Sequence, residues 1–169
     1  MGIKSKIIAF LVGLFSKEVV VILLAALPIF ELRLSIPIAM FKFNMPAYEA
    51  YLLSILGNML PVIPFLIFLR WAVVRLERLH FLGKFLKWWF ERAEAKSKAI
   101  KTYGFWGLVI FIAIPLPGTG AWTGCVVATL FNFKLVRATM ACFLGVLGAG
   151  IIVLVLCGGI GQILPFLSK

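Results

Sequence analysis

Acidic residues and histidine are scarce in this sequence. The chain has six glutamates, no aspartate and seventeen lysines and arginines, and His80 is its one histidine. Without aspartate there can be no aspartyl intramembrane protease, and no His-Glu-x-x-His pattern of a zinc protease occurs. His80 lies in a basic stretch far from any cysteine or carboxylate cluster, which predicts a solvated side chain rather than a metal ligand. The sequence therefore predicts no enzyme, no bound metal and no cofactor.

Cysteine is also rare, and its spacing argues against the usual cysteine sites. Cys125, Cys142 and Cys157 all lie in apolar segments, where a free thiol behaves as a small hydrophobic side chain. No C-x-x-C pair occurs. We therefore expect neither a disulfide nor a metal centre.

Charged residues make up only 14% of the chain, whereas hydrophobic residues make up 63%. Two uncharged runs, residues 102–133 and 138–168, are each longer than the roughly 20 residues that cross a bilayer as a helix. This composition predicts an all-α integral membrane protein. The length leaves room for about four to six membrane-embedded helices in a single domain over residues 1–169.

The positive charge is concentrated in one segment. Nine of the seventeen lysines and arginines fall within residues 70–101, interleaved with aromatic residues such as Phe81, Trp88 and Trp89. Such a stretch between apolar segments is typical of an amphipathic cytoplasmic segment that contacts anionic lipid headgroups. Nucleic-acid binding needs a soluble folded module, which the sequence does not contain. We therefore expect membrane lipids as partners, and no nucleic acid.

Helix breakers occur at matching places in the two halves of the chain. Ala-Leu-Pro at 26–28 and Ala-Ile-Pro at 113–115 lie 87 residues apart, and Gly57 and Gly145 lie 88 apart. Proline removes a helical hydrogen bond and clashes with the preceding turn. The breakers therefore predict interrupted helices in both halves, and a kink near Pro61 in the first.

These matches predict two inverted repeats, about residues 1–70 and 84–169. Each repeat is expected to contain an amphipathic helix, a re-entrant hairpin (residues 19–43 and 103–131) and a transmembrane helix. A hairpin returns to its own side, so each repeat crosses the membrane once and the second enters with the opposite orientation. Repeats of this kind, with broken elements near the midplane, are typical of secondary transporters.

The first hairpin tip carries two opposite charges, Glu31 and Arg33. An ionisable side chain at membrane depth costs about 3 kcal/mol or more and persists when it is paired or functional. We predict a substrate- or ion-binding site here, in which Glu31 binds and releases a proton and Arg33 holds an anionic group. The alternative is that the two side chains only pair with each other or lie among headgroups. Asn58 either adds a polar contact to this site or bonds a neighbouring helix.

The second hairpin tip is the Pro-Leu-Pro-Gly-Thr-Gly sequence at 115–120, in which Pro117, Gly118, Thr119 and Gly120 are the candidate site residues. Its helix breakers free backbone N–H and C=O groups, which in a membrane must face protein or a wet cavity. We predict that this loop, with Trp122 beside it, lines the substrate path opposite the first tip. A purely structural turn between two spans is the alternative.

Four segments of the sequence carry a family resemblance: ELRLSIP at 31–37, GNMLP at 57–61, YGFWG at 103–107 and, most specifically, PLPGTGAW at 115–122. Together they resemble the putative small multi-drug export protein family. The resemblance implies a small multi-pass exporter of the prokaryotic plasma membrane.

More distantly, the paired hairpins look like the DedA superfamily. Its members are implicated in proton-coupled transport and in moving lipids such as polyprenyl phosphates between leaflets. The second hairpin of that superfamily carries arginines, whereas residues 102–133 contain none. Arg33 is therefore the one candidate anion anchor near a hairpin tip.

Three functions remain open at this point. The leading hypothesis is a transporter or permease that exports a small amphipathic, cationic or lipid-like substrate, coupled to protons through Glu31. The second is a flippase or scramblase for phospholipid or polyprenyl phosphate. The third is a non-transporting membrane scaffold. Glycine-rich helices also favour a homodimer.

We predict that residues 70–101 are cytoplasmic. In a cysteine-free background, Lys96→Cys is expected to react with a membrane-impermeant maleimide only after the cells are permeabilised, because positive loops stay inside. Lys42→Cys, in a turn expected outside, is the positive control. Labelling of Lys96→Cys in intact cells would contradict the topology.

Overall fold

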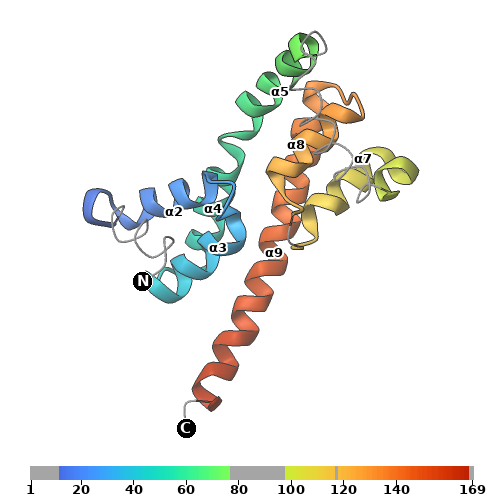
Figure 1. Cartoon of the computed structure of the whole chain (residues 1–169). Helices are drawn as coiled ribbons and strands as arrows, with labels where there is room; N and C mark the ends of the chain where they lie inside the picture. Colours follow the sequence, from blue (N-terminus) through green and yellow to red (C-terminus); the bar gives the residue numbers. More distant parts are fainter. Residues whose placement is uncertain (1–11, 77–97, 117, 168–169) are drawn as a thin grey trace. The chain divides into compact units, whose positions relative to one another are not determined.

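The computed structural model describes residues 12–76, 98–116 and 118–167, and every regular element in these ranges is a helix (Figure 1). The prediction of an all-α fold is therefore confirmed. Contacts divide the chain into two compact units, which we call unit 1 (Met1–Asn58 with Gly150–Lys169) and unit 2 (Met59–Ala149). The single-domain organisation stays a prediction.

Two helical segments of the described chain are long and apolar enough to cross a membrane. They are Ala47–Val73 and Leu135–Gly158. Two shorter apolar helices, Tyr103–Ala113 and Ala121–Leu130, belong to the second predicted hairpin. The amphipathic segment expected over residues 70–101 lies largely outside the described residues, although its first part continues a helix to Leu76.

Unit 1 begins with a helix–turn–helix. Helix α2 (Lys17–Ala26) stops where Leu27 precedes Pro28, since the residue before proline is pushed out of the helical region, and Leu27 has φ −79° and ψ 135°. The amide of Glu31 donates to the carbonyl of Leu27 at 2.9 Å. This bond closes the turn, and α3 (Glu31–Pro37) starts immediately after it.

After α3 the helix widens into a π-helical turn, and the chain then turns again. Pro37 has no N–H to continue the helix, and the next turn is the π-helix η1 (Ile38–Lys42). Asn44 follows with φ 52°, a left-handed conformation that asparagine tolerates better than most residues. The turn leads into α4 (Ala47–Met59).

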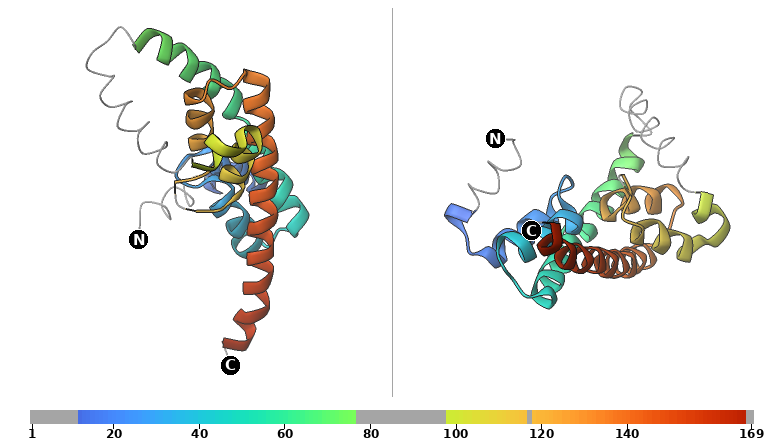
Figure 2. Two further views of the ribbon diagram at one scale, coloured as in Figure 1. Left: turned by 90° about the vertical axis from the view of Figure 1, so that its right-hand side faces the viewer. Right: turned by 90° about the horizontal axis from the view of Figure 1, so that it is seen from below.

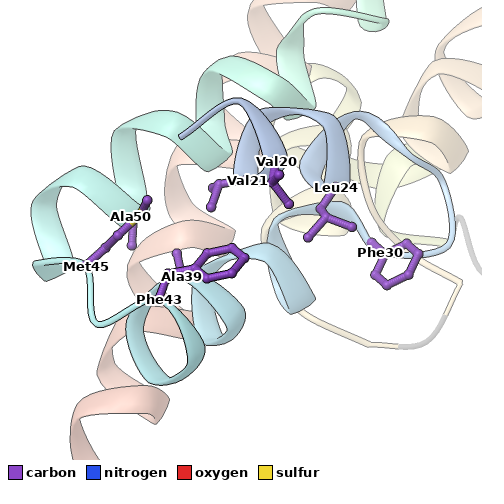
Figure 3. Close-up of a cluster of buried hydrophobic side chains, with 8 residues drawn as sticks. All are labelled: Val20, Val21, Leu24, Phe30, Ala39, Phe43, Met45 and Ala50. Atoms are coloured by element: carbon purple, nitrogen blue, oxygen red, sulfur yellow. The ribbon is translucent and has the colours of Figure 1, made fainter. Parts of the chain in front are cut away.

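The core of unit 1 forms where α2 packs on α3 and η1 (Figure 3). Its buried members are all apolar and come from α2, the residue before α3, η1, the turn after η1, and α4. They are Val20, Val21, Leu24, Phe30, Ala39, Phe43, Met45 and Ala50. These contacts fix which side of the short helix α3 faces inward.

Unit 2 contains α5 (Val62–Leu76), α7 (Lys98–Ala113), α8 (Ala121–Leu130) and the first part of α9 (Leu135–Leu167). Helix α8 packs against both α5 and α7 (Figure 2). The predicted kink is present, because Leu60 and Pro61 separate α4 from α5. Gly104 interrupts α7 with φ 54°.

The turn that ends α8 uses the same conformation as the turn that ends η1. Asn132 has φ 51°, and the amide of Phe133 donates to the carbonyl of Ala128 at 2.9 Å, the wide hydrogen bond typical of a helix that ends in a left-handed residue. The Arg70 guanidinium of α5 donates to the carbonyl of Phe133. This bond fixes the end of α5 beside the turn.

Close helix contacts also match between the halves. A Cβ at Gly57 of α4 would overlap the Ile22 carbonyl of α2. A Cβ at Gly145 of α9 would lie 2.5 Å from the Ile112 Cβ of α7 and 3.0 Å from the Val109 oxygen. In each half the helix after the asparagine turn therefore approaches the first helix at a glycine. The inverted orientation of the halves in a membrane stays a proposal.

Gly57→Ala is expected to lower the free energy of unfolding by about 1–3 kcal/mol, because the added methyl group meets backbone that cannot rotate away. Gly158→Ala is the matched control, since nothing lies within 4 Å of a Cβ at that exposed helical position. Thermal unfolding in detergent, followed by circular dichroism, should show a lower midpoint for Gly57→Ala alone. Equal midpoints for both variants would refute the close approach of α2 and α4.

Candidate functional site

Glu31 occupies an unusual backbone position. It is the first residue of α3 and has φ 49°, although it is not a glycine. For such a residue the left-handed region costs roughly 1–2 kcal/mol. Its side chain is nevertheless kept inside the protein, with 9% of the residue exposed. A strained and buried carboxylate is a candidate for function, because strained residues cluster at functional sites.

Arg33 lies two residues further along α3 and forms an ion pair with Glu31. Its Nε is 3.9 Å from the Oε2 of Glu31. This separation lies at the outer limit of an ion pair. Each side chain is mostly buried, with 19% of Arg33 and 11% of Glu31 exposed. The pair reduces the net charge inside unit 1.

Ser35 extends this polar face by one helical turn. Its hydroxyl donates to the Oγ of Ser54 on α4 at 2.7 Å, and both serines are fully buried. Residues four apart on a helix share a face, so Glu31 and Ser35 line one side of α3. Ser54 and Asn58 line one side of α4 in the same way.

We call Glu31, Ser35, Ser54 and Asn58 the buried polar cluster. Asn58 is 1% exposed, and no described residue donates a hydrogen bond to its Oδ1. Leaving a buried acceptor without a partner costs about 1–3 kcal/mol. A bound molecule with an N–H or O–H group, or a water, would remove that cost.

The second hairpin tip is held together by Thr119. The Thr119 hydroxyl lies 2.7 Å from the carbonyl of Ile114 and 2.9 Å from that of Leu116. Gly118 and Gly120 have φ 78° and 143°, conformations that glycine adopts without strain. Thr119 is therefore engaged in stabilising the loop, while its role in lining a substrate path stays a prediction. Pro117 lies outside the described residues.

Trp122 joins α8 to α5 by an aromatic contact. Its ring centroid is 4.5 Å from that of Phe65, with the planes 58° apart. Its Nε1 is buried, and within the described chain it has no hydrogen-bond acceptor. The ring borders a tight crevice with Pro61, Val62 and Cys125. Trp122 thus presents a buried donor in unit 2, as Asn58 presents a buried acceptor in unit 1.

The predicted site residues fall into two groups. Glu31, Arg33 and Asn58 belong to unit 1, and residues 118–122 belong to unit 2. The expected meeting of the two hairpin tips stays a prediction. In the described ranges, no three side chains of histidine, cysteine, aspartate or glutamate are placed to hold a metal ion.

The sequence analysis missed Ser35 and Ser54. Both are short polar residues inside apolar helices, and either could have been a solvent-facing or lipid-facing serine. Their spacing could have indicated them. Ser35 lies four residues after Glu31 and Ser54 lies four residues before Asn58, and both Glu31 and Asn58 were predicted site residues. Only the hydrogen bond between α3 and α4 shows that the two serines meet.

A comparison with protein families identifies the chain. The model of the putative small multi-drug export protein family matches residues 31–152. This chain belongs to that family. The matched region starts at Glu31 and contains the whole buried polar cluster, the second hairpin tip and most of both candidate spans. The family description and the two apolar helices indicate a membrane protein of the small exporter type.

No curated protein and no solved structure matches the chain. The substrate of this family member therefore has to be argued from its own residues.

Ser54→Ala is expected to destabilise unit 1 by about 1–3 kcal/mol, because the buried Ser35 hydroxyl loses its acceptor. The double variant Ser35→Ala/Ser54→Ala should be less destabilised than the sum of the single variants, since it leaves neither polar group behind. Unfolding midpoints of the four proteins in detergent measure this coupling. Additive effects would show that the two hydroxyls do not interact.

Proposed function

We propose that this protein is a multi-pass secondary transporter of the prokaryotic plasma membrane that exports a small amphipathic cation, with Glu31 as the proton-coupling group. The observation that carries the proposal is the buried polar cluster around Glu31. In a chain that is 63% hydrophobic, burying a carboxylate, an arginine, two serines and an asparagine is costly. Such residues in membrane proteins mark substrate and ion pathways.

The chemistry of the cluster supports a positively charged substrate. Its side chains offer carboxylate, hydroxyl and amide oxygens, all of which accept hydrogen bonds. A protonated amine supplies positive charge to Glu31 and N–H donors to Asn58 Oδ1. Protonation of Glu31 removes the negative charge and weakens this binding. Competition between proton and cation for one carboxylate is sufficient to couple their movement in opposite directions.

The matched features of the two halves support inverted repeats. Each half has a helix broken at a proline-containing loop, a left-handed asparagine turn and a glycine contact. Under our proposal both broken helices are re-entrant hairpins that enter from opposite faces. Trp122 would then add a buried N–H donor to the path.

Lipid flipping is a second candidate, favoured by Arg33. Its guanidinium is mostly buried and 3.9 Å from Glu31, and arginine binds phosphate in two-point contacts. A lipid phosphate could replace Glu31 as its partner. Reduction of a fluorescent headgroup by dithionite in proteoliposomes tests this function, because only flipped lipid becomes accessible.

We predict that Glu31→Gln abolishes the pH dependence of ethidium flux in proteoliposomes, since glutamine cannot exchange a proton. The wild-type protein should respond to an imposed pH gradient. Flux in Glu31→Gln with wild-type magnitude and pH profile would show that Glu31 is structural.

Two controls separate chemistry from folding. Glu31→Asn also removes the charge and suits the left-handed backbone, so it should be at least as stable as Glu31→Gln and equally insensitive to pH. If positive charge alone matters, Arg33→Lys should retain more flux than Arg33→Ala. If the planar two-point contact of arginine is needed, the flux of Arg33→Lys should be little higher than that of Arg33→Ala. Midpoints of thermal unfolding show whether each variant is folded.

A further inference from the structure

A second group of charged side chains lies in unit 2, outside the site described above. Arg75 on α5 is exposed, as are Lys134 and Arg137 at the start of α9, whereas Arg70 is half-buried. The guanidinium of Arg70 donates to the carbonyl of Phe133, the residue immediately before Lys134. This hydrogen bond joins α5 to the α8–α9 turn, and the exposed basic side chains that these two segments carry are called the basic surface.

This basic surface has no acidic neighbours in the part of unit 2 that the structure describes. Residues 59–76, 98–116 and 118–149 contain no glutamate or aspartate. The exposed charges therefore cannot be neutralised within these ranges. A partner that carries negative charge would complement them.

An aromatic side chain accompanies the charges. Trp71 is 58% exposed, and the Arg75 guanidinium lies 5.6 Å from the centre of its ring. Tryptophan and arginine are both enriched at the level of lipid headgroups, where one part of the side chain is apolar and the other is wet. This pairing distinguishes the surface from a simple cluster of lysines.

The position of the basic surface along the helices also favours contact with lipid headgroups. The first candidate span ends at Val73 and the second begins at Leu135. Arg75 and Lys134 therefore lie just outside these spans, and Arg137 lies in the first turn of the second. Charges at the ends of apolar spans lie at the depth of the lipid phosphates.

We propose that Arg75, Lys134 and Arg137, with Trp71 beside them, bind the phosphate headgroups of anionic phospholipids. Arg70 is a positioning residue, because its guanidinium is bound to the Phe133 carbonyl and holds the two segments together. The binding is independent of transport through Glu31. It gives the protein a preference for membranes rich in acidic lipid.

The test compares lipid affinities of the full-length protein in neutral detergent. Native mass spectrometry gives apparent dissociation constants for phosphatidylglycerol and phosphatidylcholine. Each basic residue near an anionic surface contributes about a fivefold change in affinity. Lys134→Gln/Arg137→Gln is therefore expected to weaken phosphatidylglycerol binding roughly 25-fold and to leave phosphatidylcholine binding unchanged.

Lys17→Gln/Lys42→Gln is the matched control. Both lysines are exposed and belong to unit 1, so the total charge falls by the same amount without touching the proposed surface. This control should keep the wild-type preference. Higher salt should weaken the preference of the wild-type protein for phosphatidylglycerol, because screening by salt shortens the range of the electrostatic attraction.

Three results would overturn the proposal: equal affinity of the wild-type protein for both lipids, an equal loss in the control, or tighter binding of a duplex oligonucleotide than of phosphatidylglycerol. If the double variant does not fold, Lys134→Gln alone should still lose about fivefold in affinity for phosphatidylglycerol. No loss in that single variant would count against the surface as well.

Discussion

Backbone hydrogen bonding at the helix breaks is the constraint on which the rest of this structure depends. An apolar chain in lipid has no water to satisfy the N–H and C=O groups that a broken helix releases. The structure meets this requirement locally. Glu31 N–H bonds Leu27, Met45 N–H bonds Ala39, and Phe133 N–H bonds Ala128. Each break is therefore a compact turn with its own hydrogen bonds, and the short helices between the turns are held in defined positions.

The two halves of the chain differ in how their buried polar side chains are used. Thr119 is buried in the second half, where its hydroxyl bonds backbone carbonyls of the loop. Four of the five buried polar residues in the described chain lie in the first half. One of these four, Asn58, has an Oδ1 that no described residue hydrogen-bonds. The halves thus share their turns and glycine contacts, while most of the buried polar side chains of the described chain lie in the first half.

The sequence predicted the broken helices because proline acts through its own backbone. Leu27 leaves the helix since Pro28 follows it, and this effect needs no tertiary contact. The Ser35–Ser54 bond and the Arg70–Phe133 bond could not be predicted, because each joins segments whose relative register is set by packing. Both faces of a membrane helix are apolar, so hydrophobic periodicity does not show which face is buried. The family resemblance was correct, and it located the region of the site without identifying its serines.

The contact at Gly57 also bears on how easily the first half can move. Helix α2 meets α4 there through the Ile22 backbone, with no side chain from Gly57 between them. Interlocked side chains must change rotamer before two helices can slide, whereas a smooth backbone contact presents a lower steric barrier. If α3 moves together with α2, the Ser35–Ser54 hydrogen bond, which joins α3 to α4 one helical turn from Gly57, has to break as well. A single exchangeable hydroxyl contact can break and reform far faster than a packed core can rearrange.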